Sequence, residues 1–277
     1  MLTATLLAIA AAALHASWNL IAKTAEDREL ALVGQFVLGG VVSAALLALV
    51  GLPGLDTLPW LALSATVHVG YVAGLIRAYE HGDFSFAYPL ARGGGAIVAA
   101  IGGVAFLGDH LGLAAWIAIA VVAAGLVALV GTRPSRHSFV SAAFTAVTIG
   151  SYTVIDAHGA RIATSGQSYG VALLACTGVS IGALGVARGR SGELLASIRE
   201  RGGRYLFSGI AGVAAYTLVL VAIRHAPVGY VTMLRESSVV LAALAGWLLL
   251  HEHMGRRRLV CSAIILAGLI GLVWSGA

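Results

Sequence analysis

Two arginines lie deep inside apolar stretches of the sequence. Arg92 and Arg235 are each about eight residues, or roughly 12 Å, inside such a segment. In a lipid bilayer a guanidinium at that depth costs at least about 2.5 kcal/mol, so both should face a cavity or a partner. A pair of guanidiniums can bind a carboxylate or phosphate through bidentate hydrogen bonds. The alternative is a structural role, with Arg235 held by Glu236 and Arg92 by carbonyls at a helix end, although neighbouring residues do not face each other on a helix.

Two acidic residues, Glu236 and Asp156, are candidates for proton coupling. A carboxylate buried in a membrane can exchange a proton and thereby couple the movement of a solute to a proton gradient. The alternative is a permanent salt bridge or, for Asp156, a position at a helix end near Arg161.

A polar stripe runs along the first apolar segment. His15, Asn19 and Lys23 recur every four residues, with Trp18 beside them. Such a stripe should face the interior of a helix bundle, where Asn19 can bind a polar solute. The alternative is helix–helix packing for Asn19 and a Lys23 side chain that reaches the membrane interface.

Aromatic residues lie at helical spacing from polar groups and predict an amphipathic cavity wall. Tyr88 precedes Arg92 by four residues, as Tyr152 precedes Asp156, and His68 precedes Tyr71 by three. We expect Tyr71, Tyr152 and Tyr216 to line a cavity and His68 to be a packing residue. Tyrosines near the ends of apolar segments are expected at the membrane interface instead: Tyr79, Tyr205 and Tyr230.

Pro89 and the three glycines that follow Arg92 predict a helix that can kink or flex during gating: Gly93, Gly94 and Gly95. A phosphate-binding glycine loop would need a preceding strand, which this context lacks. The run His251–His253 does not have the spacing of a zinc-binding helix. We therefore predict neither a metal site nor a cofactor.

The composition indicates that these residues are carried by transmembrane helices. Of 277 residues, 59% are hydrophobic and 10% are charged, against about 25% charged in soluble domains. An excess of five positive charges is explained by basic loops rather than by nucleic-acid binding. We predict an all-α polytopic membrane protein with ten transmembrane helices, at 2–22, 30–51, 58–79, 84–107, 112–131, 139–156, 168–187, 205–225, 229–250 and 257–275.

The connections between these segments divide sharply by charge. Thirteen Lys and Arg residues lie in connections after odd-numbered segments and two in connections after even-numbered ones. The positive-inside rule then places the odd-numbered connections in the cytoplasm and both termini on the other side. The longest basic connection, 188–204, is interpreted as a solvated loop rather than an amphipathic segment on the lipid headgroups.

The two halves of the chain resemble each other. An offset of 143 residues aligns Arg92 with Arg235, Gly103 with Gly246, Asp109 with Glu252, His110 with His253 and Gly125 with Gly268. We therefore predict two repeats of five helices, 1–137 and 138–277. Because five is odd, the second repeat enters the membrane upside down, as in secondary transporters with a central site.

Several runs of residues resemble the EamA-type transporters of the drug/metabolite transporter superfamily: ASWNLIAK at 16–23, YPLARG at 88–93, MLRESS at 233–238, and the pairs Gly108-Asp109 and His251-Glu252. The last pair departs from the usual Gly-Glu of the family, which indicates a changed helix end. The resemblance covers the whole chain and implies a ten-helix bundle around a central cavity that carries small metabolites, often outward.

From these observations we expect a secondary transporter in the cell (inner) membrane that moves a small polar or amphipathic metabolite by alternating access. Export of an amino acid or a related compound is the most specific form of this prediction. The alternatives are an intramembrane enzyme acting on a lipid-linked substrate, for which the sequence has no GxSxG or HExxH motif, and a channel or scaffold. The expected partners are the solute and the lipid bilayer, without nucleic acid; a monomer is compatible with the sequence.

Overall fold

The computed structural model describes residues 1–276 except 24, 82–83, 130–135 and 250–254; inside its helices, nothing is described of the side chains of 19–23, 78–81, 84–88, 245–246 and 249. Every regular element in the described part of the chain is helical. The elements are α1 (Leu2–Lys23), α2 (Arg28–Val50), the 3-10 turn η1 (Leu55–Thr57), α3 (Leu58–His81), α4 (Phe84–Leu107), α5 (Leu113–Ala128), α6 (Arg136–Ile162), α7 (Gly166–Ala187), α8 (Ser191–Ile223), α9 (Val228–Leu234), α10 (Ser237–Leu249) and α11 (Arg256–Trp274).

The helices have the length and surface of membrane spans. Among the described residues, seven helices are long and apolar enough to cross a bilayer, and two shorter apolar stretches lie at Leu2–Trp18 and Leu113–Ala128. Large apolar side chains point outward on several helices; Leu49 and Phe106, for example, are each more than 80% exposed. Such a surface is unfavourable in water and favourable against lipid tails.

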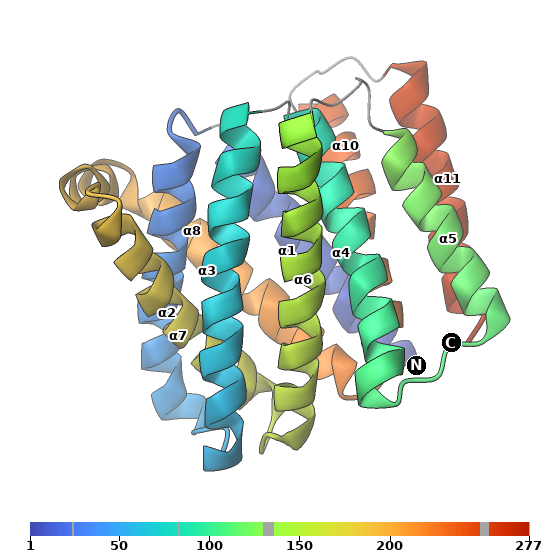
Figure 1. Ribbon diagram of the computed structural model, residues 1–277, viewed down its shortest axis with the longest axis horizontal. Coiled ribbons are helices and arrows are strands. Elements are labelled where there is room, and N and C mark those ends of the chain that lie inside the picture. Colours follow the sequence, from blue (N-terminus) through green and yellow to red (C-terminus); the bar gives the residue numbers. More distant parts are fainter. Residues whose placement is uncertain (24, 82–83, 130–135, 250–254, 277) are drawn as a thin grey trace.

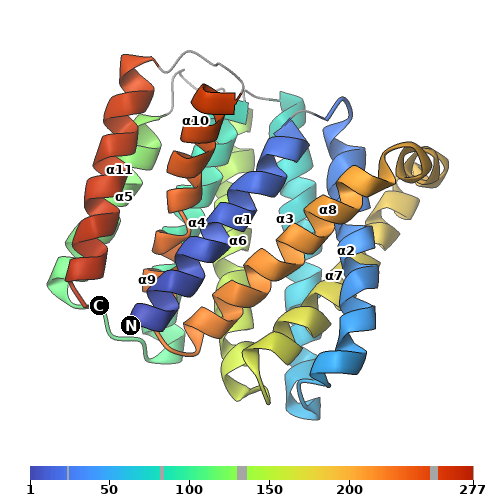
Figure 2. The ribbon, with the colours of Figure 1, turned by 180° about the vertical axis from the view of Figure 1, so that it is seen from behind.

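Successive long helices run in opposite directions, and both termini lie at the same end of the bundle (Figures 1 and 2). At one side α5 packs against α11, and at the other α2 packs against α7 and α8. Between these pairs, α1 crosses α8, and α6 packs against both α3 and α4. The middle of the bundle is therefore surrounded by helices from both halves of the chain.

The segment predicted as one span over 229–250 is divided into α9 and α10. Arg235 and Glu236 form a turn between them, in which the N–H of Glu236 donates to Met233 O and that of Ser238 donates to Arg235 O, both at 3.0 Å. These bonds reach back three residues instead of four, so the helix is interrupted while the chain continues in the same direction (Figure 2). The prediction of a continuous helix was wrong because hydropathy does not distinguish these two bonding patterns.

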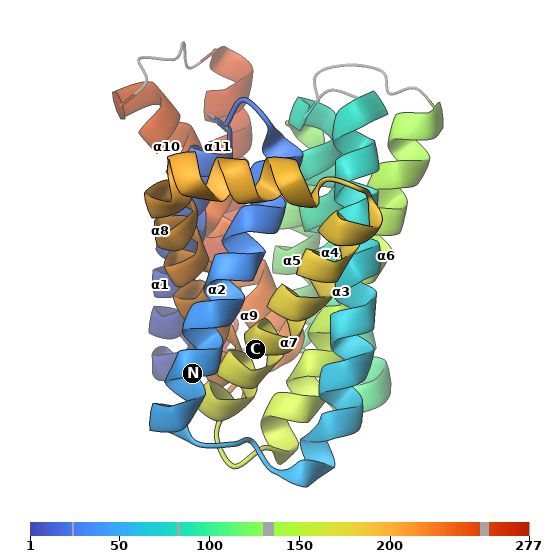
Figure 3. The same ribbon diagram turned by 90° about the vertical axis from the view of Figure 1, so that its left-hand side faces the viewer.

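The basic connection 188–204 is also different from the predicted loop. Residues from Ser191 onward belong to α8. The first turns of that helix run crosswise over the N-terminal end of α2 (Figure 3). Leu194 is buried, and Arg190 binds Asp27 and Glu29 at the start of α2. The apolar residues among the arginines give this segment a buried face, which favours a helix over a solvated loop.

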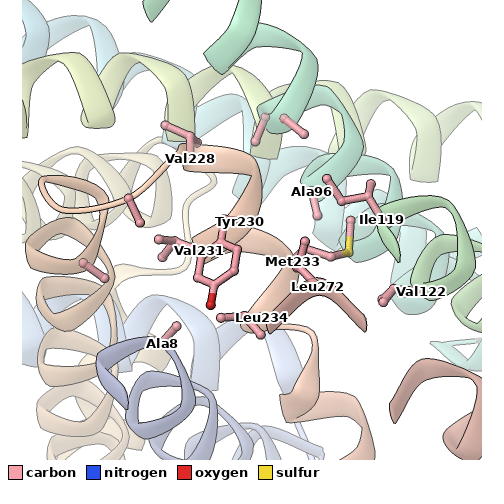
Figure 4. Close-up of a cluster of buried hydrophobic side chains, with 14 of the residues drawn as sticks. Ala8, Ala96, Ile119, Val122, Val228, Tyr230, Val231, Met233, Leu234 and Leu272 are labelled. Atoms are coloured by element: carbon pink, nitrogen blue, oxygen red, sulfur yellow. The ribbon is translucent and has the colours of Figure 1, made fainter. Parts of the chain in front are cut away.

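The short helix α9 is buried along its whole length (Figure 4). Tyr230 was predicted at the membrane interface, but it is 1% exposed in the core. Its hydroxyl lies 2.6 Å from Thr5 Oγ1 of α1, so the polar end of the ring is hydrogen-bonded inside the bundle. The prediction failed because Tyr230 lies in an interrupted helix that the core covers.

Glycines let the helices approach closely. A Cβ added at Gly40 of α2 would lie 2.8 Å from Gly178 Cα of α7. In α4, Cβ atoms added at Gly93, Gly94 and Gly95 would come within 3 Å of side chains of α5 and α6. The helix α4 is continuous through Pro89 and these glycines. The structure therefore gives the glycines a packing function, while their part in gating stays a prediction.

Candidate functional site

A cavity of about 90 Å³ lies in the middle of the bundle. It can hold several water molecules, since one needs roughly 10–15 Å³ of such space. The cavity is bounded by α1, α2, α3, α4, α6, α7 and α8 and by the turn after α9. Its polar and aromatic lining consists of His15, Trp18, Gln35, Phe36, His68, Tyr71, Arg92, Tyr152, Ser208, Tyr216 and Arg235.

Arg92 is paired with an acid from the other half of the chain. Its Nη2 donates to Glu236 Oε1 at 2.7 Å, and the two side chains are only 7% and 4% exposed. The charge of Arg92 is thus compensated, and Glu236 Oε2 has no further hydrogen bond within the described chain.

Arg235 has different surroundings although it is the counterpart of Arg92. Its guanidinium carbon lies 5.6 Å from the centre of the Tyr216 ring, a cation–π distance. Within the described part of the chain, no carboxylate or carbonyl accepts a hydrogen bond from it. Arg235 lines the cavity, so this guanidinium is available to an anionic solute.

Asp156 lies behind the cavity wall and is fully buried. Tyr216 Oη donates to its Oδ2 at 2.6 Å, Tyr169 Oη donates to Oδ1 at 3.4 Å, and the Ser64 hydroxyl is also close. Arg161, the partner considered in the sequence analysis, binds Asp109 instead. Asp156 is therefore held by hydroxyl groups. One of them belongs to Tyr216, whose ring is the one that the Arg235 guanidinium faces.

The aromatic residues form one wall of the cavity. The Tyr152 ring is stacked on His68, with centres 3.9 Å apart, and stands edge-on to Tyr71 and Tyr216 at 5.6 and 6.1 Å. Across the cavity, His15 and Trp18 of α1 contact each other edge-to-face at 4.7 Å. A flat apolar group can pack between such rings while a charged group reaches Arg235.

The structure brings most of the predicted site residues together. Seven of them line the cavity: His15, Trp18, Tyr71, Arg92, Tyr152, Tyr216 and Arg235. Glu236 and Asp156 do not line the cavity, but each contacts a residue that does: Glu236 binds Arg92, and Asp156 binds Tyr216. The side chains of Asn19 and Tyr88 lie outside the described part of the chain, as does the run 251–253.

Sequence reasoning did not place three polar residues in the cavity: Gln35, His68 and Ser208. His68 was interpreted as a packing residue, but it both stacks on Tyr152 and lines the cavity. Gln35 was not considered, although it is an isolated polar residue in the apolar helix α2. An amide alone in an otherwise apolar span is the signal that could have identified it.

The two ends of the bundle differ. At the end that carries both termini, Arg161 binds Asp109 at 2.7 Å, and the other oxygen of Asp109 accepts the N–H of Val228 at 2.6 Å. Arg224 donates there to the carbonyl oxygens of Ala160 and Ala163. These contacts join α6 to the segment that follows α4 and to the connection between α8 and α9.

At the opposite end a small second cavity shares Gln35 and Ser208 with the central one and is lined by Arg201 and Arg204. Glu26 beside it binds Arg201 at 2.7 Å, and this hydrogen bond lowers the pKa of Glu26. At Asp27, burial raises the pKa, but hydrogen bonds from Arg190 and from the N–H of Leu30 lower it by more. Two arginines thus line this second cavity, and the acids Glu26 and Asp27 near it are each paired with an arginine.

Comparisons with known proteins agree on the type of fold. Residues 138–274 match the EamA-like transporter family. Among solved structures, one described only as the crystal structure of a protein superposes with a TM-score of 0.78 over 99% of both chains, at 20% sequence identity. The search of curated proteins gives no match.

Proposed function

Because the chain belongs to the EamA-like transporter family, part of the drug/metabolite transporter superfamily, we propose that it is a secondary transporter that carries a small polar or amphipathic metabolite across the cell membrane by alternating access. It is an integral membrane protein of several spans. The family is one of transporters, and we propose no enzymatic activity.

One observation supports this proposal most: two buried arginines, one from each half of the chain, line a single central cavity. Burying a guanidinium in a membrane protein is expensive unless it has a partner or faces a polar space. Glu236 provides the partner for Arg92, and the cavity provides the polar space for Arg235. A site in the middle of the bundle, reached by a solute from one side at a time, is what alternating access requires.

The unequal ends of the bundle favour the same mechanism. Asp109, Arg161 and Arg224 close one end by ion pairs and hydrogen bonds, whereas the other end has a second cavity adjoining the first. This arrangement is consistent with a state open toward the basic end. The charge bias of the connections assigns that end to the cytoplasm and both termini to the opposite side.

We also propose that residues 1–137 and 138–277 are two inverted repeats of five membrane segments, with α9 and α10 together as the ninth. The helix contacts support this symmetry: α1 packs on α8 as α6 packs on α3, and α4 packs on α6 as α10 packs on α1. The pairs α2–α7 and α5–α11 each join a helix to its own counterpart. The family match over 138–274 spans the second repeat.

We also propose a class of solute and a direction of transport. Arg235 and the aromatic wall favour a carboxylate attached to an apolar body, which is compatible with an amino acid or a related compound. Export agrees with a cavity that is approached from the cytoplasmic end.

The test begins with a thermal-shift screen of the purified protein against a metabolite panel, followed by uptake of the stabilising solutes into liposomes. We expect the folded Arg92→Ala and Arg235→Ala variants to move these solutes poorly. The proposal fails if no solute enters faster than into empty liposomes, or if uptake is undiminished when both arginines are replaced.

A further inference from the structure

We propose that the central cavity selects a small planar or aromatic monocarboxylate without an ammonium group, in preference to an amino acid. This inference rests on the transport function proposed above and narrows its substrate class.

The charges around the cavity give the first argument. Arg92 and Glu236 form an ion pair at 2.7 Å, so together they contribute no net charge. Arg235 adds one positive charge, which faces the cavity and, in the described chain, the ring of Tyr216. Asp156, which is held by hydroxyl groups behind the wall, adds no charge in its protonated form. One carboxylate on the solute would neutralise this charge. A dicarboxylate would leave one buried negative charge without a partner, which is unfavourable in a low dielectric.

An amino acid would bring an ammonium group that also needs a partner. In the described part of the chain, the two acids next to the cavity do not line it. Glu236 Oε1 accepts from Arg92, and Asp156 accepts from Tyr216 and Tyr169 behind the wall. Asp156 does not reach the cavity surface, because Tyr152 and Tyr216 line the cavity in front of it. A desolvated ammonium beside Arg235 would therefore be unfavourable.

Aromatic rings can bind an ammonium through cation–π contacts, but two of the rings are occupied. The Tyr216 ring is faced by the guanidinium of Arg235, and the Tyr152 ring is stacked on His68. The other rings of the lining, Trp18, Phe36 and Tyr71, can pack against a flat hydrocarbon group at distances of about 4.5–7 Å between ring centres. An ammonium on one of these rings would share the cavity with the positive charge of Arg235, which is unfavourable. The wall therefore suits the body of an aromatic acid better than a cation.

Three probes that share one phenyl ring and a short chain test this inference: 3-phenylpropionate has the carboxylate alone, L-phenylalanine has carboxylate and ammonium, and phenethylamine has the ammonium alone. Their binding to the purified wild-type protein is measured by isothermal titration calorimetry. We expect 3-phenylpropionate to bind at least about tenfold more tightly than L-phenylalanine, since an unpaired buried charge costs 1.4 kcal/mol or more, and phenethylamine not to bind.

Variants test whether the selectivity depends on the charge of Arg235. Arg235→Gln should weaken 3-phenylpropionate binding by about tenfold or more, with Arg235→Lys intermediate. Gln35→Glu places an acid in the wall and should shift the ratio of affinities toward L-phenylalanine. Arg256→Gln, at the exposed start of α11, is the control and should change neither affinity. Thermal unfolding of each variant checks that it is folded.

Equal or tighter binding of L-phenylalanine, or no binding of 3-phenylpropionate, would overturn the inference. The transport proposal is judged separately, because it stands if any solute from the metabolite screen is taken up in a manner that depends on the two arginines. Uptake of an amino acid with that dependence would therefore refute the substrate class and leave the transporter intact.

Discussion

Arg92 and Arg235 occupy equivalent positions in the sequence but are placed differently. Arg92 binds Glu236 across the interface between the two halves, whereas Arg235 lies over Tyr216 beside the cavity. The ion pair ties α4 to the turn before α10 and leaves a single guanidinium to meet the solute. Both arginines line the cavity, but Arg92 has an acidic partner, whereas Arg235 faces an aromatic ring.

The two acids proposed for proton coupling also differ in their contacts. Protonating Glu236 would leave the charge of Arg92 uncompensated in the core, which is strongly unfavourable. Asp156 is held by hydroxyl groups, so it can bind a proton without removing the partner of a cation. Of the two candidates, the contacts favour Asp156.

We therefore predict that Asp156→Asn abolishes the stimulation of uptake by a proton gradient in liposomes while uptake without a gradient persists. Tyr216→Phe keeps the carboxyl group but removes its shortest hydrogen bond, and it should shift the pH dependence without abolishing it. If Glu236→Gln removes the stimulation in a folded protein and Asp156→Asn does not, this assignment is wrong.

At the scale of the elements, contacts between glycines decide how closely the helices pack. Gly40 of α2 meets Gly178 of α7, and Gly39 meets Gly209 of α8, with backbone against backbone. Small residues are needed because no flexible side chain can move aside at such a contact. The cavity walls formed by α2, α7 and α8 are positioned by these crossings.

Gly40→Ala is expected to destabilise the protein by about 1–3 kcal/mol, because the added Cβ would lie 2.8 Å from the Gly178 backbone. The matched control is Gly203→Ala in α8, where nothing lies within 4 Å of an added Cβ. There, the higher helix propensity of alanine should stabilise the protein by up to about 1 kcal/mol. Thermal unfolding in detergent compares the two, and equal melting temperatures would contradict the packing argument.

For the whole molecule, the proposed mechanism depends on a difference between the two ends. Ion pairs and hydrogen bonds join the helices at one end, and a second cavity adjoins the central one at the other. Asp109 accepts hydrogen bonds from Arg161 and from the N–H of Val228, so it holds α6 and the start of α9 against α4. Alternating access requires these contacts to break when the other end closes. The Asp109 contacts are therefore expected to control how often the closed end opens.

Asp109→Asn should make the interior more accessible from the end that carries the termini, since it removes the charge that binds Arg161. A cysteine at the fully buried position Ala157 of α6, in a chain whose Cys176 and Cys261 are replaced by alanine, reports this opening. Its reaction with a membrane-impermeant maleimide should be faster with Asp109→Asn than without it. An unchanged rate would show that these contacts do not limit opening.

The sequence by itself determined the membrane class, the approximate positions of most helices, the family and the two arginines, because apolar periodicity and buried charges are local signals. It did not reveal the break at Arg235–Glu236, the helical start of α8 or the role of Gln35. Nor did it decide which acid binds Arg92 and which lies behind Tyr216. Those features depend on contacts between residues far apart in the chain, such as Arg92 with Glu236, and only the packing of the two halves brings these side chains within hydrogen-bonding distance.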